Sequence, residues 1–247
     1  MRKRLDELLV ERKLVETRAR ARGLILRGHI FVNGGAAEKA GQIVADDARL
    51  EIAADADLYV SFGAGKLATA LAEFGPAFDV KDRIALDVGA STGGFTDVLL
   101  RRGARRVYAV DVGHDQLHAR LRADPRVVAL EGIDARKLDR VLVPEPIGAI
   151  VADTSFISLT KVLPVPMSLA VPGAWLVALI KPQFEAGPEA VGRGGIVRDK
   201  DDRARAIAIV RDWLAAQPGW RVAELMTWPG LQGRANEEYL IGAQRDV

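Results

Sequence analysis

The chain has 247 residues, of which 49% are hydrophobic and 28% are charged, as is typical of a globular protein with one large core, or with one core and a small appendage. It contains no cysteine, which excludes disulfide bonds, a thiolate nucleophile and cysteine zinc sites, and its three scattered histidines argue against a metal site. No apolar run approaches the length of a membrane span, and the basic N-terminus lacks the apolar stretch of a signal peptide. We therefore expect a cytoplasmic protein that needs no metal and binds no membrane.

The charge is concentrated at one end of the chain. Residues 1–30 contain nine basic and four acidic side chains, a net charge of +5, whereas the whole chain carries only +2. A basic head on a mildly acidic body is typical of proteins that bind phosphate backbones, although a solvated surface has the same composition.

Two helices and a small sheet are predicted for the first fifty residues. Leu5, Leu8 and Leu9 share one helical face, and a second helix is expected from Thr17, as its N-cap, to a stop at Gly28. Strands are then expected at 29–32 and 49–52, the first leading into the tight turn Asn33-Gly34.

The motifs of this segment resemble the S4 RNA-binding domain, named after a ribosomal protein. The resemblance rests on residues 4–10, 17–20, 24–28 and 32–34. It implies that the two basic helices bind structured RNA by its shape and its phosphates. The arginines expected to contact RNA are Arg4, Arg18, Arg20, Arg22 and Arg27.

The chain is divided into an S4-type domain at residues 1–54, a small and acidic linker at 55–61, and a second domain at 62–247. The second domain opens on a helix that carries Lys66 in its first turn. A lysine there opposes the helix dipole, so another interaction is expected to hold it.

From residue 84 onward, predicted strands and helices alternate. This alternation is typical of an α/β fold with a mostly parallel sheet covered by helices on both faces. The expected strands are 84–88, 107–110, 127–130, 147–152, 175–180 and 222–227, and the expected helices are 95–102, 116–122, 159–169 and 203–216. Sites in such sheets gather at the carboxyl ends of the strands, where Asp87, Asp111, Asp153 and Lys181 stand.

The turn after the first of these strands predicts a nucleotide site. Glycine allows the backbone to bend and to approach a ligand closely, and the following helix offers unpaired N–H groups. The spacing is not Gly-x-Gly-x-x-Gly, which disfavours a dinucleotide and favours S-adenosylmethionine, a ligand without a pyrophosphate. The expected cofactor contacts are Asp87, Gly89, Ala90, Ser91, Gly93, Gly94, Asp111 and Asp134.

Three of these contacts are given specific partners. Asp111 is expected to accept hydrogen bonds from the ribose diol, Asp87 from an amino group, and Asp134 from the adenine amine. The alternative for Asp134 is an ordinary turn aspartate.

A lysine at the end of the apolar strand 174–180 needs a partner, and Asp153 on the neighbouring strand can supply one. Lys181 and Asp153 are thus either a structural ion pair or catalytic groups. Desolvation and the second ammonium of Lys66 favour a neutral Lys181 amine that can accept a proton, whereas the carboxylates favour the charged form.

Taken together, these segments resemble the TlyA family of ribosomal RNA 2'-O-methyltransferases, in which an S4 domain precedes an FtsJ-like methyltransferase domain with a Rossmann-like class I sheet. The matching segments are 60–67, 87–96, 111–113, 153–159, 181–185, 194–199 and 236–239. The family's catalytic tetrad falls on Lys66, Asp153, Lys181 and Glu238. Where this chain has Asp134, the family usually has asparagine.

The resemblance implies S-adenosylmethionine as cofactor and direct in-line methylation of a cytidine ribose in 23S ribosomal RNA, with 16S RNA as a second candidate. The partners would be ribosomal RNA or ribosomal subunits, and Lys181 would deprotonate the 2'-hydroxyl. Two alternatives stay open: a membrane-active hemolysin, a label that members of the family have carried, and an RNA-binding ribosome-assembly factor with an inactive methyltransferase fold.

Overall fold

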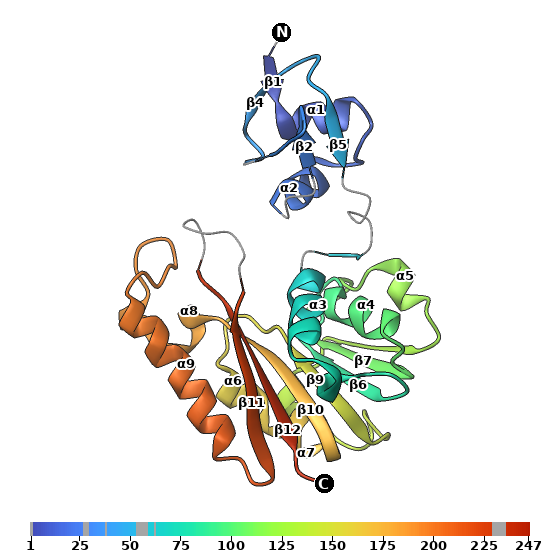
Figure 1. The fold of residues 1–247 in the computed structure, drawn as a ribbon. Helices are drawn as coiled ribbons and strands as arrows, with labels where there is room; N and C mark the ends of the chain where they lie inside the picture. The colour runs from blue at the N-terminus through green and yellow to red at the C-terminus, as the bar shows by residue number, and fades with distance from the viewer. Residues whose placement is uncertain (1, 27–29, 38, 53–58, 62, 229–235) are drawn as a thin grey trace. The chain divides into compact units, whose positions relative to one another are not determined.

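The structure is a computed structural model that describes residues 2–26, 30–37, 39–52, 59–61, 63–228 and 236–247. The candidate RNA contact Arg27, the expected helix stop Gly28 and linker residues 55–58 lie outside these ranges. The chain divides into two units, Met1–Phe62 and Gly63–Val247. Each unit is described by itself (Figure 1).

The two helices expected in the first unit are present. Helix α1 (Leu5–Glu11) and helix α2 (Arg18–Leu26) bury the predicted leucines of α1 against Leu24 and Ile25 of α2. Thr17 caps α2, because its Oγ1 accepts a hydrogen bond from the Arg20 amide at 3.1 Å. The arginines of α2 therefore lie outside this small core.

The strands of the first unit form two small sheets. Strand β2 (Ile30–Val32) pairs with β3 (Gly35–Ala36) and with β5 (Leu50–Ile52), and the turn at Asn33 and Gly34 has the positive φ angles of 52° and 83° that a tight hairpin requires. Strand β1 (Arg2–Arg4) pairs with β4 (Ile43–Ala45). This second pair was not predicted, because β1 is entirely basic and shows no apolar alternation.

The described part of the second unit contains a seven-stranded sheet in the order β11-β12-β10-β9-β6-β7-β8. Its parallel strands are β6 (Ile84–Val88), β7 (Arg106–Asp111), β8 (Val127–Glu131), β9 (Ile147–Ala152) and β10 (Ala170–Ile180). Strands β11 (Trp220–Thr227) and β12 (Tyr239–Arg245) run antiparallel at one edge.

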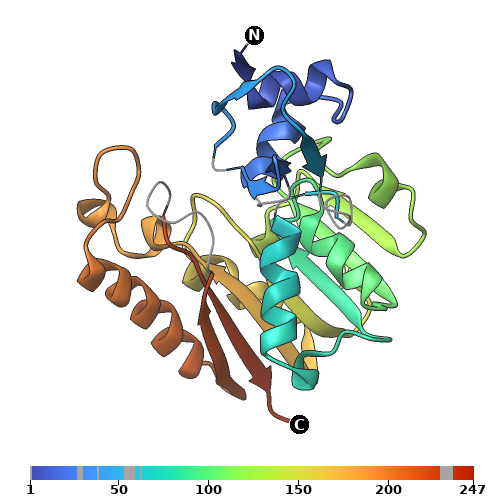
Figure 2. The same cartoon turned by 45° about the horizontal axis from the view of Figure 1, so that its top comes forward.

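Helices cover both faces of this sheet, as expected (Figures 1 and 2). One face carries α3 (Gly63–Glu73), α4 (Gly94–Arg101) and α5 (Ala119–Arg122). The other carries α6 (Leu159–Val162), α7 (Pro164–Ser168) and α9 (Lys200–Ala215), while the one-turn helix α8 (Pro182–Glu185) follows β10. Short 3-10 turns lie at η1 (Pro76–Phe78), η2 (Ala135–Lys137) and η3 (Pro188–Ala190).

Three elements differ from the prediction. The expected helix 159–169 is broken into α6 and α7, because Pro164 and Pro166 lack the N–H groups that a continuous helix needs. The helix expected from residue 116 begins only at Ala119, after His118, whose Nδ1 accepts from the Arg120 amide. Strand β12 was missed, although it positions Glu238 immediately before its first residue.

The order of the parallel strands reverses between the neighbouring strands β6 and β9. Strands β7 and β8 lie on one side of this point, and β9 and β10 lie on the other. Ligands of open α/β sheets bind at such a point, outside the carboxyl ends of the strands.

Candidate active site

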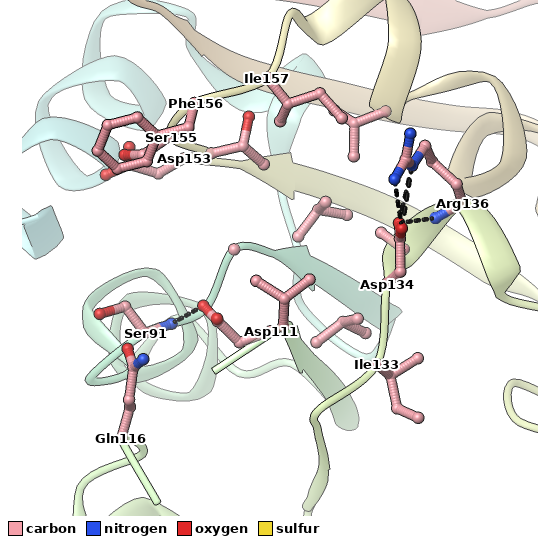
Figure 3. A pocket seen from close by; sticks show the side chains of 17 residues that line it. Ser91, Asp111, Gln116, Ile133, Asp134, Arg136, Asp153, Ser155, Phe156 and Ile157 are labelled. Atoms are coloured by element: carbon pink, nitrogen blue, oxygen red, sulfur yellow. Dashed lines mark hydrogen bonds and ion pairs between the residues drawn. The ribbon is translucent and has the colours of Figure 1, made fainter. Parts of the chain in front are cut away.

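A cavity of about 510 Å³ opens at this switch point, large enough for a nucleoside. It is lined by residues that follow three parallel strands. Gly89 and Ser91 follow β6, Asp111 ends β7, and Asp153 follows β9. Figure 3 shows Ser91 and Asp111 on one side of the cavity and Asp153 on the other.

The glycine turn brings β6 and β9 close together. Gly89 has a φ angle of +83°, and a Cβ atom added to it would lie 2.7 Å from the carbonyl oxygen of Asp153. A side chain would therefore be strained and would push the Asp153 backbone away. Only glycine leaves the edge of the cavity as it is.

Asp111 is held in place by backbone donors. The amide of Ser91 donates to one of its carboxylate oxygens at 2.8 Å, and the amide of Gly113 donates to the other at 2.8 Å. The carboxylate thus lies in the cavity wall with a fixed orientation, and its further lone pairs suit a diol.

Three of the predicted cofactor residues have other surroundings. Gly93 has a φ angle of +93°, and an added Cβ would lie 2.2 Å from the Leu121 side chain, so this glycine permits α4 to begin close to α5. Ala90 and Gly94 are buried. The lining residues of the cavity, as far as the structure describes it, include Gly89 and Ser91 but not these three.

Asp87 lies beneath the cavity rather than in its wall. Its side chain is fully buried, and its Oδ2 accepts from Thr96 Oγ1 of α4 at 2.7 Å. Its Oδ1 is buried with no hydrogen-bond partner among the described residues. Burial, together with the nearby carboxylates of Asp153 and Asp111, raises the pKa of Asp87 to about 7.

Asp134 already has a partner in the protein. Arg136 Nη2 lies 2.6 Å from its carboxylate, and the Arg136 amide donates to it at 2.9 Å (Figure 3). These interactions lower the pKa of Asp134 to about 2. The residue lines the cavity as an anion, paired with an arginine that sequence reasoning did not single out.

Lys181 and Asp153 form the ion pair that the sequence predicted. Lys181 Nζ lies 2.5 Å from Asp153 Oδ1 and donates to Ser155 Oγ at 3.1 Å. Because β9 and β10 are parallel neighbours, both residues follow their strands at the same edge of the sheet. The side chains are 12% and 20% exposed, so a substrate can reach the pair.

Lys66 and Glu238 form a second pair, with Nζ and Oε2 2.5 Å apart. Strand β12 places Glu238 beside Lys181, because Ile180 and Tyr239 are partners in the β10–β12 register. The structure thus joins the four expected residues as two ion pairs at the same edge of the sheet.

The helix that carries Lys66 lies over β12 because Gly242 leaves room for it. A Cβ atom at Gly242 would lie 2.8 Å from Phe78 and 3.0 Å from Phe74. The absence of that side chain lets the end of α3 and the following turn approach the strand. Lys66, in the first turn of α3, then reaches Glu238, which is the interaction expected to hold it.

Sequence reasoning missed two features beside the ion pairs. Glu185 of α8 accepts hydrogen bonds from Ser158 Oγ at 2.6 Å and from the Leu159 amide at 2.8 Å, and so links the loop after β10 to the loop after β9. Phe156 lines the cavity with a φ angle of +64° and is 91% exposed, 5.2 Å from the ring of Phe184. Both residues lie in segments that carry the family resemblance, 153–159 and 181–185, but the sequence alone does not show that these two segments are in contact.

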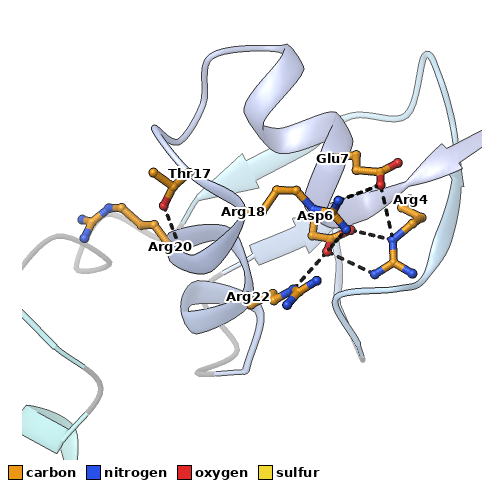
Figure 4. Close-up of polar contacts among 7 residues, drawn as sticks. All are labelled: Arg4, Asp6, Glu7, Thr17, Arg18, Arg20 and Arg22. Carbon is orange, nitrogen blue, oxygen red and sulfur yellow. Dashed lines mark hydrogen bonds and ion pairs between the residues drawn. The ribbon is translucent and has the colours of Figure 1, made fainter.

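Three of the expected RNA contacts of the first unit lie around one carboxylate. Arg4, Arg18 and Arg22 contact Asp6, whereas Arg20 extends from another side of α2 (Figure 4). In the described ranges no His, Asp and Glu side chains form a group of three that could hold a metal ion. Over the same ranges, no helix is long and apolar enough to cross a membrane.

A nucleoside cofactor fits this arrangement. The cavity has the size of an adenosyl group, Gly89 leaves space that a Cβ would fill, and the fixed carboxylate of Asp111 faces the interior. Asp153 lines the cavity and pairs with Lys181, and the Lys66–Glu238 pair lies at the same edge of the sheet. Such pairs can exchange a proton with a hydroxyl group and hold it for attack.

Two family models and several known proteins match the chain. The FtsJ-like methyltransferase family matches residues 59–245, and the S4 domain matches residues 3–50. A Mycobacterium tuberculosis protein named 16S/23S rRNA (cytidine-2'-O)-methyltransferase TlyA is 43% identical over 242 residues, which cover 97% of this chain and 89% of that protein. A Brachyspira hyodysenteriae protein named hemolysin A is 43% identical over 197 residues, 79% of this chain and 81% of that one.

A solved structure from Streptococcus thermophilus, described as a candidate hemolysin, is 38% identical and has a TM-score of 0.72, covering 99% of this chain and 89% of the other. These comparisons confirm the resemblance and the fold class predicted from the sequence. The chain belongs to the FtsJ-like methyltransferase family, whose methyl donor is S-adenosylmethionine, and it joins that domain to an S4 domain as its TlyA relative does.

Proposed function

We propose that this protein transfers a methyl group from S-adenosylmethionine to the 2'-hydroxyl of a cytidine ribose in ribosomal RNA. The observation that carries the proposal is the Lys181–Asp153 pair, whose carboxylate lines a nucleoside-sized cavity, with the Lys66–Glu238 pair at the same edge of the sheet. The name of the Mycobacterium tuberculosis relative supports the choice of ribosomal RNA and of cytidine. With that substrate, the enzyme works in the cytoplasm, on RNA or on ribosomal subunits.

The residues that would hold the cofactor are those that line the cavity. Asp111 is suited to the ribose diol, Gly89 and Ser91 to the backbone contacts beside it, and Ile133 to one face of the adenine. Asp134 is available to the adenine amine, because a carboxylate that binds Arg136 keeps further lone pairs. When bound, the cofactor supplies a methyl group on a positively charged sulfur.

Asp87 would contribute to this site from below. Its unpartnered Oδ1 is fully buried, so it acts on the cofactor through the field of its charge and through the position of Thr96. A bound cation above it would favour the ionised carboxylate.

Lys181 is the group that takes the proton. A ribose 2'-hydroxyl is a weak nucleophile, so its proton must leave as the oxygen bonds to the methyl carbon. The neutral amine of Lys181 would accept that proton, and Asp153 Oδ1, which lies 2.5 Å from Nζ, orients it toward the hydroxyl. No covalent enzyme intermediate is formed.

Lys66 and Glu238 have a supporting role. Their pair places one positive and one negative charge next to the reacting ribose without changing the net charge of the site. The pair thereby fixes the charge balance around the ribose.

The function is tested by incubating the protein with S-adenosylmethionine carrying a labelled methyl group and with 30S subunits, 50S subunits or protein-free ribosomal RNA. The labelled RNA is then digested to nucleosides and analysed by mass spectrometry. We expect 2'-O-methylcytidine at a defined position of one or both RNAs. Label on a base, or no label on any of the three substrates, would contradict the proposal.

The hemolysin name of the Brachyspira relative points to a second candidate function, lysis of membranes. The same preparations separate the two. Release of haemoglobin by the purified protein at low concentration, unchanged in Lys181→Ala, would favour lysis. An inactive assembly factor would bind ribosomal RNA in these assays but transfer no label.

A further inference from the structure

One buried carboxylate in the first unit contacts three arginines. Asp6, in the first turn of α1, is 0% exposed. Its Oδ1 accepts from Arg4 Nε at 3.0 Å, and its Oδ2 accepts from Arg4 Nη2 at 3.1 Å, Arg18 Nη2 at 3.1 Å and Arg22 Nε at 3.2 Å (Figure 4). We refer to Arg4, Arg18 and Arg22 as the arginine cluster.

The cluster compensates for the burial of Asp6. An isolated carboxylate in a protein interior would be costly, and here three guanidinium groups satisfy both of its oxygens. They hold the pKa of Asp6 well below its usual range, despite the opposing effect of burial. The carboxylate is therefore a permanent negative charge at the centre of the cluster.

The same contacts leave the arginines open to a ligand. Their side chains are 41%, 46% and 53% exposed, although the carboxylate between them is inaccessible. A guanidinium group has five N–H donors, and each member of the cluster uses one or two of them on Asp6. A second, half-exposed carboxylate, Glu7, lies 3.1 Å from Arg18 Nη1 and 3.7 Å from Arg4 Nε. The donors that neither carboxylate engages can bind a ligand at the surface of the unit.

The cluster is assembled from separate elements. Arg4 ends β1, whereas Arg18 and Arg22 are one turn apart on α2. The guanidinium of Arg4 lies over Gly41, where an added Cβ would be 3.2 Å from Nη1. Asp6 is the common partner that brings arginines from two elements into one fixed group.

Fixed arginines suit the phosphates of a nucleic acid. Planar guanidinium groups bind phosphate oxygens through paired N–H donors, and side chains that are already ordered lose less entropy on binding. The net charge of +5 on residues 1–30 attracts a polyanion to this unit.

We propose that Asp6 is a positioning residue for RNA binding: it holds Arg4, Arg18 and Arg22 as a preformed cluster that binds backbone phosphates of the substrate RNA. The inference rests on the proposed function, since it takes ribosomal RNA to be that substrate. It assigns a role in anion binding to a residue that is itself an anion.

The negative charge of Asp6 makes the proposal testable, because two explanations predict opposite effects of removing it. Asp6→Asn removes a negative charge, so charge alone predicts tighter RNA binding, whereas loss of the fixed cluster predicts weaker binding. Glu11→Gln is the matched control, because it removes one negative charge from the same helix at a side chain that contacts Lys3 rather than the cluster. Affinity for ribosomal RNA is measured with the full-length chain over a range of salt concentrations.

We expect Asp6→Asn to weaken RNA binding by about tenfold or more, from the ordering of several arginine side chains, and to flatten its salt dependence. Glu11→Gln should bind as the wild type does or more tightly. Equal or tighter binding by Asp6→Asn would overturn the inference.

A third variant tests the proposal if Asp6→Asn fails to fold, which circular dichroism would detect. Arg22→Lys keeps the charge of the cluster but loses the planar guanidinium whose Nε donates to Asp6, and it leaves the buried carboxylate with two arginines. We expect it to bind RNA more weakly than the wild type, and wild-type affinity in this variant would also overturn the inference. If the wild-type protein itself neither binds nor methylates ribosomal RNA, the proposed function fails instead.

Discussion

The buried carboxylate of Asp87 makes the stability of the methyltransferase unit depend on pH in a way that one substitution can isolate. Its pKa rises from an ordinary value of 3.8 to about 7 in the folded protein. Between these values the folded state binds more protons at this site than the unfolded state does. The contribution of Asp87 to stability is therefore complete below about pH 4, and it is lost as the pH rises through 7.

The size of the effect follows from the same values. At about 1.4 kcal/mol per pH unit, the change from 3.8 to about 7 corresponds to a loss of about 4 kcal/mol between acid and neutral pH. Asp87→Asn cannot ionise, and its side-chain oxygen can still accept from Thr96 Oγ1. We expect the variant to gain stability relative to the wild type as the pH is raised from 5 to 8.

The assay is urea unfolding of both proteins without cofactor at pH 5, 6, 7 and 8. The quantity of interest is the difference between the two unfolding free energies at each pH, because titrating groups that do not interact with Asp87 cancel from it. The difference should change by a few kcal/mol in favour of Asp87→Asn and level off near pH 8, by linkage. A difference that stays constant over this range would refute the interpretation of Asp87 as a carboxylate kept protonated by burial.

Two further predictions concern the cavity and the ion pairs. Gly89→Ala should weaken S-adenosylmethionine binding, measured by calorimetry, because its Cβ would displace the Asp153 carbonyl. We expect a loss of at least about tenfold, which corresponds to about 1.4 kcal/mol of binding free energy. The control is Gly75→Ala, which has a similar φ angle of +76° but open space around it and should bind the cofactor normally. Lys66→Met and Glu238→Gln should each lower the methyl-transfer rate constant, and the double variant should lose little more than either one, since the two side chains act as a pair. Additive losses in the double variant would contradict that pairing.

The sequence predicted those parts of the structure for which a local pattern of residues is compatible with one arrangement. Alternating strands and helices predicted the sheet, and the glycine turn with Asp111 predicted the wall of the cavity. Lys181 needed a partner because it ends a buried strand, and the parallel neighbour offered Asp153, so this pair could be predicted from desolvation alone.

Other parts of the site depend on contacts that no local pattern contains. The partner of Lys66 could not be derived from spacing, because Glu238 reaches it only through β12, a strand that inserts antiparallel between β10 and β11. The turn predicts a cofactor contact at Gly93, but it could not predict that the space beside this glycine is filled by Leu121 of α5. The role of Asp6 could not be predicted from the sequence, because its burial and its three arginine partners depend on the packing of α1 against α2 and β1.

The most direct test of the proposed chemistry is single-turnover methyl transfer to ribosomal RNA by the wild type, Lys181→Ala and Lys181→Arg, with cofactor affinity measured in parallel. Arginine keeps a positive charge beside Asp153 but cannot take up a proton, so it separates charge from proton transfer. We expect both variants to bind S-adenosylmethionine normally and to transfer the methyl group at least about a hundredfold more slowly. Wild-type transfer rates in both variants would show that Lys181 does not deprotonate the ribose hydroxyl.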